Sequence, residues 1–355
     1  MTALPFTSAL IDDAELAPLF APAAELRAML AFETALAAAQ AEAGMISGAA
    51  ASAIARACTE FTPDEAALRA GLFKDGVLGP GFVAALRKTL PVEHQKALHL
   101  GATSQDVTDT ALTIRLKPVL SILAARLTAL IAALQDLSAA QGAVRLMGQT
   151  RMQAALPILA RDKIASWEQP LHRHLARLAE LAPRLLVIQL GGPVGNRAEL
   201  GAAADAVAAG LAARLGLGDA QCWHTARDNI VAFGALLAMI AGALGKIGQD
   251  AAILAQSENG ALKIEGGGAS SAMAHKVNPV TAEHLVALAR FAGGLAGTLN
   301  QALVHENERS GAAWTLEWLV LPQLVCTTGA ALQAGLGLIA RLHFIDRAKP
   351  GDDRA

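Results

Sequence analysis

Aromatic side chains are scarce in this sequence of 355 residues: phenylalanine, tryptophan and tyrosine together make up 4%, and tyrosine is absent. The hydrophobic fraction is nevertheless 54%, and it consists largely of alanine and leucine. These two residues are strong helix formers, whereas β-sheets favour aromatic and β-branched residues. The composition therefore predicts closely packed helices. It excludes intrinsic disorder as the dominant state, because so apolar a chain buries enough surface to fold.

Cysteine is also rare, and Cys58, Cys222 and Cys326 lie far apart in the sequence. An odd number of cysteines without a C-x-x-C pair indicates neither a disulfide framework nor a zinc site. The 29 basic and 31 acidic residues leave a net charge of −2, so no positive field draws the chain to nucleic acid or anionic lipid. The first nine residues lack the basic segment of a secretory signal, and we expect a cytoplasmic protein.

Two long stretches without charge raise the question of a membrane. Asn229–Gly245 has 17 such residues and Trp318–Ala340 has 23. A helix that is apolar all round belongs either to a membrane or to the interior of a large protein. Because the second stretch contains Pro322 and several polar residues, we expect both to be buried helices of a bundle.

Apolar residues recur at alternating spacings of three and four over 116–137 and 230–254. This spacing turns one face of a long helix toward its neighbours. Pro118 lies just inside the first segment, so that helix either kinks or begins there. Further helices are expected over Ala23–Ala43, Gly81–Leu98, Pro157–Leu181, Ala198–Leu215, Val280–Leu303 and Ala312–Leu342, with a strand-like run only over Leu185–Leu190.

The expected fold is therefore all-α, with a long central helical bundle. Since the shorter helical patterns come first, we place an N-terminal helical domain over 1–105. The long-helix bundle, expected to be the oligomerisation core, follows over 106–345, and a polar tail over 346–355.

A glycine-rich segment, Asn259–Pro279 (NGALKIEGGGASSAMAHKVNP), interrupts the helices. A long stretch without a helical face in a compact domain is usually functional or mobile. Ser270 supplies a hydroxyl and Lys276 a cation, while Asn278 and Pro279 fit the N-cap and first position of the next helix. From the pattern alone, a flexible connector is an equally good interpretation. A phosphate-binding P-loop is excluded because its residue order is missing.

The segment His99–Asp109 (HLGATSQDVTD) reads as the start of another helix. Thr103 and Asp106 fit a capping box, which is a purely structural interpretation. The same free N–H groups and hydroxyls at a helix start also suit an anion. His99 taken alone is typical of a structural histidine.

Two further segments carry polar side chains. In Gly148–Pro157 (GQTRMQAALP), Arg151 and Gln153 are two residues apart and share a face only in an extended chain. In His305–Trp318, a charged cluster precedes the long uncharged stretch, as is common at solvated helix starts.

Taken in order, these segments resemble the three motif regions of the fumarase/aspartase superfamily of homotetrameric lyases, over most of the chain. The matching sequences are TSQD at Thr103–Asp106, GQTRMQAALP at Gly148–Pro157 and SSAMAHKVNP at Ser270–Pro279. The third is close to the superfamily pattern G-S-S-x-M-P-x-K-x-N-P, which is highly specific at that length. Ala269 and Ala274 replace a glycine and a proline of that pattern, and the chain is short enough that we expect a shortened C-terminal domain.

Four segments are similar to the branch of the superfamily that lactonises 3-carboxy-cis,cis-muconate in protocatechuate breakdown. They are HLGATSQDVTDT at His99–Thr110, QLGGPVG at Gln189–Gly195, WHTARD at Trp223–Asp228, and HENER…WTLEWLVLPQL at His305–Leu324. Arg151 stands where many superfamily lyases have histidine. A departing amine needs an acid, whereas an attacking carboxylate is already ionised and suits an arginine. This favours a cycloisomerase over an amine lyase.

The resemblance implies a site built from all three motif regions. Ser270 would exchange the proton with carbon, and Lys276 and Asn278 would stabilise the charged forms. The residues that would hold the substrate are Thr103, Ser104, Arg151, Gln153, Ser271, Met273, His99, His305 and Arg309. The resemblance further implies a small polycarboxylate substrate, a homotetramer with sites shared between subunits, and no metal or organic cofactor; neither nucleic acid nor a membrane is expected as a partner.

Two alternatives stay open at this point. One is an adenylosuccinate- or argininosuccinate-type lyase that releases fumarate by β-elimination, against which Arg151 counts. The other is a catalytically inactive structural paralogue. The intact Ser270 and Lys276 argue against inactivity, while Ala269 and Ala274 leave it open.

Overall fold

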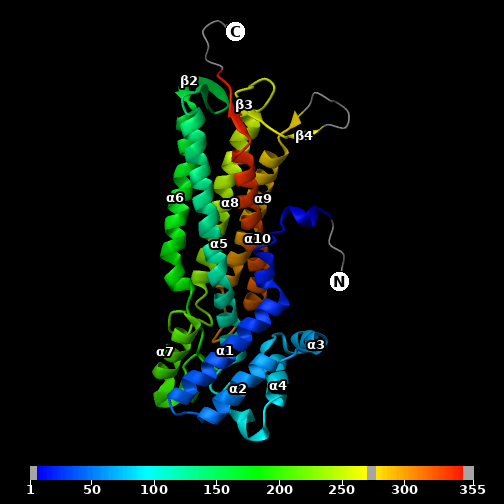
Figure 1. Ribbon diagram of the computed structural model, residues 1–355, viewed down its shortest axis with the longest axis vertical. Coiled ribbons are helices and arrows are strands. Elements are labelled where there is room, and N and C mark those ends of the chain that lie inside the picture. The colour runs from blue at the N-terminus through cyan, green and yellow to red at the C-terminus, as the bar shows by residue number, and fades with distance from the viewer. Residues whose placement is uncertain (1–5, 270–276, 347–355) are drawn as a thin grey trace.

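Five long helices run side by side along the molecule in this computed structural model, which describes residues 6–269 and 277–346 (Figure 1). They are α5 (Ser104–Gln141), α6 (Ala160–Leu185), α8 (Asp228–Leu254), α9 (Val280–Asn300) and α10 (Ala312–Ile339). Helix α8 packs against α6, α9 and α10, while α5 packs against α6 and α10. This arrangement confirms the expected all-α fold with a long central bundle.

The bundle buries both apolar seams expected from the sequence. The seam residues of α5 over 116–137 and of α8 over 230–254 are at most 7% exposed. Helix α5 begins at Ser104, so Pro118 lies inside the helix and not at its start. Among the described helices, α5, α8 and α10 are long and apolar enough to cross a membrane by length and composition alone. Their apolar faces join one buried core, as expected for helices of a large bundle.

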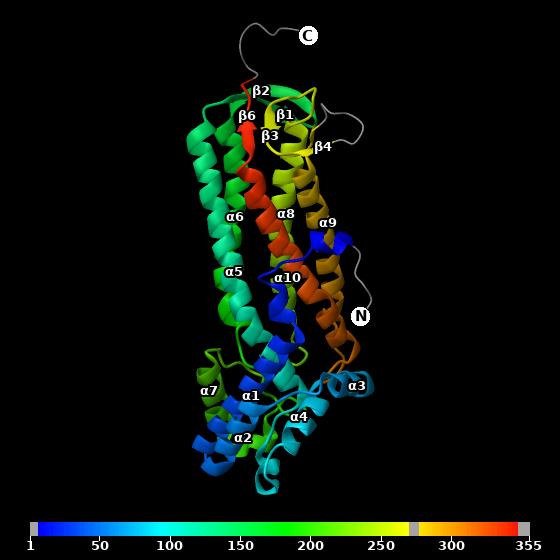
Figure 2. The same cartoon turned by 45° about the vertical axis from the view of Figure 1, so that its right-hand side comes forward.

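A second buried core lies at the lower end of the molecule, where the N-terminal helices and α7 gather (Figure 2). These helices are α1 (Pro22–Glu42), α2 (Gly48–Glu60), α3 (Glu65–Asp75), α4 (Gly79–Lys88) and α7 (Ala204–Leu215). The described chain also forms the 3-10 helices η1 (Phe6–Leu10), η2 (Ala17–Phe20), η3 (Val92–Ala97), η4 (Ala198–Ala203) and η5 (Gln301–Leu303). Leu211 of α7 shares this core with residues of α1, α2 and α4. A later segment thus packs with the N-terminal helices, and the division at residue 105 stays a prediction.

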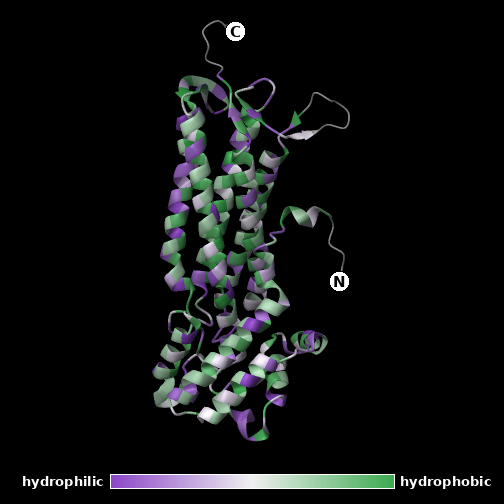
Figure 3. Ribbon diagram, viewed as in Figure 1, coloured by the Kyte–Doolittle hydropathy of each residue, from purple (hydrophilic) through white to green (hydrophobic). Residues whose placement is uncertain are grey.

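The short strands of the described residues pair at the upper end of the bundle (Figure 2). They form three antiparallel pairs: β1 (Arg145–Thr150) with β2 (Gln153–Leu159), β3 (Leu262–Ile264) with β6 (Leu342–Phe344), and β4 (Gly268–Ala269) with β5 (Val277–Asn278). Figure 3 shows hydrophilic residues concentrated along α6, at the outside of the bundle. The short strands therefore cap a bundle whose interior is apolar.

Two expected helices are interrupted at identifiable residues. The helix expected over Gly81–Leu98 ends at Lys88 and is followed by a 3-10 turn. Pro91 explains the end, because proline cannot continue a helix and restricts the residue before it. The helix expected over Ala198–Leu215 begins as the 3-10 helix η4, which is kinked at Gly201 with a positive φ of 53°, and continues as α7 from Ala204.

The helix expected over Pro157–Leu181 begins only at Ala160. The residues before it are extended, since Pro157 in β2 pairs with Met147 in β1. The backbone N–H of Leu159 donates to the Asp162 carboxylate at 2.9 Å, and this contact marks the start of α6. The expected helix start was therefore wrong by three residues, because a hairpin occupies the preceding segment.

Three smaller differences concern element ends. The helices expected to reach Leu303 and Leu342 end at Asn300 and Ile339, the first continuing as η5 and the second followed by β6. The run Leu185–Leu190 forms no strand in the described chain beyond a single bridge to Gly218. The polar tail from residue 347 onward lies outside the described residues.

Candidate functional site

The described residues among those that the resemblance assigns to a site lie at two ends of the molecule. Thr103 and Ser104 mark the start of α5 at the lower end, whereas Arg151 and Gln153 lie in the hairpin beyond its upper end (Figure 2). Helix α5 has 38 residues, which at 1.5 Å per residue makes it roughly 57 Å long. One copy of the chain therefore does not bring the first two motif regions together.

The hairpin β1–β2 presents Arg151 at its tip. Arg151 and Met152 form the turn with φ values of 50° and 67°, and Thr150 pairs with Gln153 on either side of it. Two successive left-handed residues are the geometry of a tight hairpin turn. The expectation of an extended chain holds for Gln153, but Arg151 lies in the turn. Both side chains are exposed and open to a ligand.

A cavity of about 230 Å³ below the hairpin is lined by Arg151, Lys163 and Lys246, and by the single carboxylate Asp250. Lys163 lies 3.8 Å from Asp250, and the indole N–H of Trp167 donates to the same carboxylate at 2.8 Å. Three cations against one anion leave this cavity positively charged. Such a cavity attracts carboxylates.

Asn278 lies at the same upper end, in strand β5, where it pairs with Gly268. The side chain is half-buried and lines an open cavity with Gly267 and Pro279. Pro279, and not Asn278, is the N-cap residue of α9, so the expected capping role of Asn278 was wrong because strand pairing occupies it. The remaining residues expected from the third motif, Ser270, Ser271, Met273 and Lys276, lie outside the described residues.

Asp106 organises the lower end of the molecule. Its buried carboxylate accepts four hydrogen bonds: from the N–H groups of Thr103 at 2.9 Å, Gly191 at 2.8 Å and Gly192 at 2.9 Å, and from Nε2 of His224 at 2.9 Å. Burial lowers the pKa of the His224 imidazole, but the Asp106 carboxylate outweighs burial, and the pKa rises to about 9. The Thr103 contact confirms the Asp106 part of the expected capping box. Asp106 also ties three distant segments together.

A buried charge cluster lies next to this contact. Arg227 donates to Asp109 at 2.7 Å and to Glu317 at 2.8 Å, and all three side chains are at most 1% exposed. The indole N–H of Trp314 also donates to Asp109, at 3.0 Å, and the guanidinium lies 4.6 Å from the centroid of the Trp223 ring. Burial lowers the pKa of Arg227, but the two carboxylates outweigh it and raise the pKa above its usual value. The cluster joins the starts of α5, α8 and α10.

His305 and Arg309 border this cluster. The His305 side chain is fully buried, with Nε2 3.5 Å from Oε1 of Glu317, and neither ring nitrogen has a hydrogen-bond partner among the described residues. Arg309 donates to the carbonyl of Pro193 at 3.2 Å, which places it beside the loop held by Asp106. Both residues therefore lie at the lower end of the molecule, near Thr103.

His99 and Ser104 are the remaining expected site residues at the lower end of the molecule. His99 has a left-handed φ of 62°, and its Nδ1 is hydrogen-bonded to the buried Glu33. Burial lowers the pKa of His99, while the Glu33 carboxylate raises it, with a net increase. Ser104 is closely covered by Gly79, where a Cβ atom would lie 2.6 Å from the serine Cβ. The lower group thus contains His99, Thr103, Ser104, His305 and Arg309.

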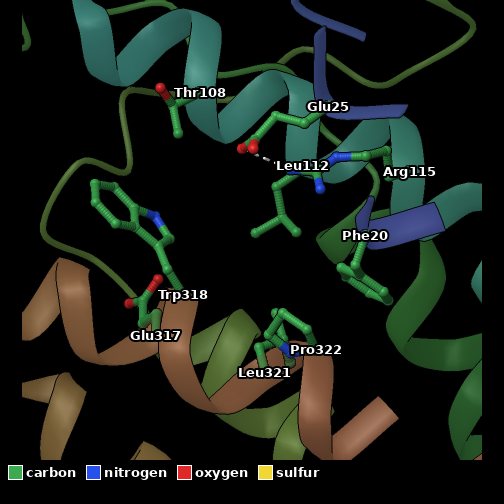
Figure 4. Close-up of a pocket in the computed structure, with 9 residues that line it drawn as sticks. All are labelled: Phe20, Glu25, Thr108, Leu112, Arg115, Glu317, Trp318, Leu321 and Pro322. Atoms are coloured by element: carbon green, nitrogen blue, oxygen red, sulfur yellow. Dashed lines mark hydrogen bonds and ion pairs between the residues drawn. The ribbon is translucent and has the colours of Figure 1, made fainter. Parts of the chain in front are cut away.

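Figure 4 shows a cavity between α5 and α10 that is also lined by Glu317, a member of the Arg227 cluster. It holds about 130 Å³ and is lined mainly by apolar residues, with the ion pair of Arg115 and Glu25 at its rim, 3.4 Å apart. The Thr108 hydroxyl is buried there without a hydrogen-bond partner among the described residues. The described chain contains no group of three or more His, Cys, Asp or Glu side chains that could hold a metal ion.

The sequence did not predict which side chains would bind the buried carboxylate of Asp109 at the lower end. Gln105 donates to Asp109 at 3.2 Å, and the amide of Gln189 reaches the same carboxylate at 3.3 Å. A signal was present, because Gln105 and Asp109 interrupt a helix start with polar residues one turn apart. Gln189 and Arg227 belong to segments that carried the resemblance without an assigned role.

A family model described as lyase matches residues 15–294 of the chain. The 3-carboxy-cis,cis-muconate cycloisomerase of Pseudomonas aeruginosa is 40% identical over 331 residues, which cover 91% of this chain and 72% of that enzyme. The solved structure of the 3-carboxy-cis,cis-muconate lactonizing enzyme from Pseudomonas putida is 37% identical, with a TM-score of 0.89 over 96% of this chain and 77% of that one. A fumarate lyase structure from a Mesorhizobium species is 31% identical, with a TM-score of 0.87 over 95% and 77%.

The family match spans most of the chain, and the similarity to relatives extends over both buried cores. The two solved structures share the overall fold with this chain, at TM-scores of 0.89 and 0.87. The chain therefore belongs to the lyase family of the fumarase/aspartase type.

Proposed function

We propose that the chain is a cycloisomerase that converts 3-carboxy-cis,cis-muconate to a carboxymuconolactone, within protocatechuate breakdown. The cycloisomerases among its relatives carry this proposal. The arginine at the tip of the β1–β2 hairpin supports it, because lactonisation needs a carboxylate partner there and no acid for a leaving amine. The substrate is a small polycarboxylate, and the positive cavity beside Arg151 suits such a molecule.

In the proposed reaction, one carboxylate oxygen of the substrate forms a bond to a carbon of a carbon–carbon double bond in the same substrate molecule. The electron pair of that double bond moves to the next carbon and is stabilised by the adjacent carboxyl group. Ser270 delivers a proton to this carbon and removes it in the reverse direction. Because an unperturbed serine is a very weak acid, Lys276 and Asn278 stabilise the charged forms.

The remaining carboxylates are held by groups from both ends of the molecule. Arg151 and Gln153 act from the hairpin, and Ser271 and Met273 act from the same motif as Ser270. Thr103 and Ser104 act from the start of α5, where the partial positive charge of a helix N-terminus favours an anion. His99, His305 and Arg309 supply further contacts at that end. Holding the substrate in a folded geometry contributes much of the rate enhancement.

Because the two ends of α5 lie far apart, we propose a homotetramer in which each site takes its motif regions from different subunits. The bundle supports this proposal with exposed apolar side chains on three helices: Met239 is 43% exposed, Phe291 41% and Leu319 61%. Light scattering of the purified protein should give the mass of four chains. A monomer at assay concentration would overturn the shared site.

The direct test of the function is the loss of ultraviolet absorbance of 3-carboxy-cis,cis-muconate in the presence of the purified chain. A cycloisomerase removes this absorbance and yields a lactone, identified by mass spectrometry. Fumarate release from a succinyl-amine instead would support the amine-lyase alternative. Turnover of neither substrate by a folded tetramer would support the inactive paralogue.

A further inference from the structure

The three cysteines of the chain occupy very different surroundings. Burial raises the pKa of the Cys58 thiol to about 11; the Thr34 contact lowers it, and the nearby Glu33 carboxylate raises it. Burial likewise raises the pKa of Cys326 to about 11. Cys222 is half-buried and lines a cavity of about 290 Å³ with Trp223. Cys326 is half-buried as well, whereas Cys58 is buried.

The side chain next to Cys222 is the imidazole of His224, which is 3% exposed. Its Nε2 is bound to Asp106, as described above, while its Nδ1 is buried and has no hydrogen-bond partner among the described residues. A Cβ atom at Gly191 would lie 2.4 Å from the Cys222 sulfur and 3.0 Å from Cε1 of His224. At Gly195 it would lie 3.1 Å from the sulfur and 3.7 Å from Nδ1. Sulfur and ring therefore face the same two glycines, with the free nitrogen on the sulfur's side.

We propose that Cys222 is a reactive thiol, activated by His224 and Asp106, and that it is the preferred site of covalent modification by small electrophiles. Nδ1 of His224 takes the thiol proton, and Asp106 stabilises the imidazolium through Nε2. The resulting thiolate attacks an electrophilic carbon: a sulfur–carbon bond forms, and the bond from that carbon to its leaving group breaks. The leaving group departs with the electron pair, as iodide does from iodoacetamide.

The charges around the pair agree with this assignment. Burial lowers the pKa of His224, but Asp106 and then the Cys222 sulfur outweigh burial and raise it to about 9. Arg184 from α6 and Asp228 from α8 line the cavity with Cys222. The thiolate is the nucleophilic form of a cysteine, and a neighbouring imidazole is the kind of group that activates it.

Modification of Cys222 has a consequence for the lower group of residues. His224 shares the Asp106 carboxylate with Gly191, Gly192 and the backbone of Thr103. An added group on the sulfur displaces His224 and disturbs that shared contact. On the proposed function, in which Thr103 holds a substrate carboxylate, modification raises KM more than it lowers kcat.

The test is alkylation of the native protein with iodoacetamide at pH 7, with the three cysteines followed separately by peptide mass spectrometry. Cys222 should react at least tenfold faster than Cys58 and Cys326, which serve as controls within the same chain. Equal rates at Cys222 and Cys326 would overturn the proposal. The rates need no substrate, so their outcome is independent of the proposed enzymatic activity.

Variants separate activation from simple access. His224→Asn should slow the alkylation of Cys222 about tenfold or more, whereas His172→Asn should leave it unchanged, because His172 is an exposed histidine paired with Glu168. If His224→Asn does not fold, the wild-type rate at pH 6 serves instead: a paired thiolate keeps most of its rate, whereas an unassisted thiol loses about tenfold per pH unit. Cys222→Ser should retain turnover and lose its sensitivity to iodoacetamide. An unchanged Cys222 rate in a folded His224→Asn, or a tenfold loss per pH unit in the wild type, would contradict activation.

Discussion

At the scale of single residues, the lower end of the molecule depends on carboxylates that accept several buried donors. Asp106 accepts from backbone N–H groups of two segments and from the His224 side chain, and Asp109 accepts from Arg227 and Trp314. Breaking a buried ion pair from one side leaves an uncompensated charge, which costs far more than the loss of a surface pair. The individual contacts therefore predict large effects of single substitutions.

Arg227→Met should destabilise the protein by about 3–5 kcal/mol, because it leaves the buried carboxylates of Asp109 and Glu317 without their cation. Urea unfolding measures this change. The matched control is Arg69→Met, which breaks an exposed pair with Glu65 and should cost at most about 0.5 kcal/mol. A loss below about 1 kcal/mol for Arg227→Met would mean that the cluster contributes little to the folded state.

The His224–Asp106 pair should make stability depend on pH in a defined window. The pKa of His224 rises in the folded protein from 6.5 to about 9, so the folded state holds the proton more tightly than the unfolded state. The stabilisation is complete below pH 6.5 and is lost as the pH rises through 9. The wild type should lose unfolding free energy over this range relative to His224→Asn. Parallel pH profiles for the two proteins would contradict the pair.

At the scale of elements, much of the fold follows from the sequence because apolar spacing decides which face of a long helix is buried. Both long seams and the range of α1 were predicted in this way, to within one residue at each end of α1. The hairpin β1–β2 was not, since Gln153–Leu159 lacks strand alternation and its exposed residues are held by pairing with β1. Local pattern contains no information about such a partner.

The same limit applies to the candidate site. Motif residues such as Thr103 and Arg151 were recognisable because their order and spacing match a family. The Asp109–Arg227–Glu317 cluster was not, because its members come together from positions 90 to 118 residues apart. Only the packing of α5, α8 and α10 makes them neighbours.

The paired strands β4 and β5 form the stem of the glycine-rich segment, and a substitution at Gly267 tests whether this stem positions the site. In Gly267→Ala the new Cβ would lie 2.4 Å from Cγ1 of Val277 and 2.8 Å from the carbonyl oxygen of Asn278, so the β4–β5 pairing must shift. We expect turnover to fall at least tenfold while the melting temperature changes by no more than a few degrees, since the strain is local. Gly48→Ala, with nothing within 4 Å of the new atom, is the control. Normal turnover of Gly267→Ala would show that the stem does not position the site.

At the scale of the whole molecule, the length of α5 keeps the Thr103 and Arg151 motif regions of one chain apart, although the proposed reaction needs both at one substrate. The positive cavity beside Arg151 lies beyond one end of the helix, and the Asp106 contacts lie at the other. Assembly of several chains is the proposed means of joining them. If each site takes residues from different chains, two inactive variants should restore activity when they assemble together, whereas a site within one chain would stay inactive in such a mixture.

The most direct measurement mixes two inactive variants, Ser104→Ala combined with Thr103→Val in one chain and Arg151→Ala in the other. Each variant alone should turn over 3-carboxy-cis,cis-muconate at least a hundredfold more slowly than the wild type while remaining tetrameric. After the two are unfolded and refolded together, some sites receive both intact motif regions, and a substantial fraction of wild-type turnover should return. Absence of recovery in mixed tetramers, while wild-type chains refolded in the same way are active, would contradict a site shared between subunits.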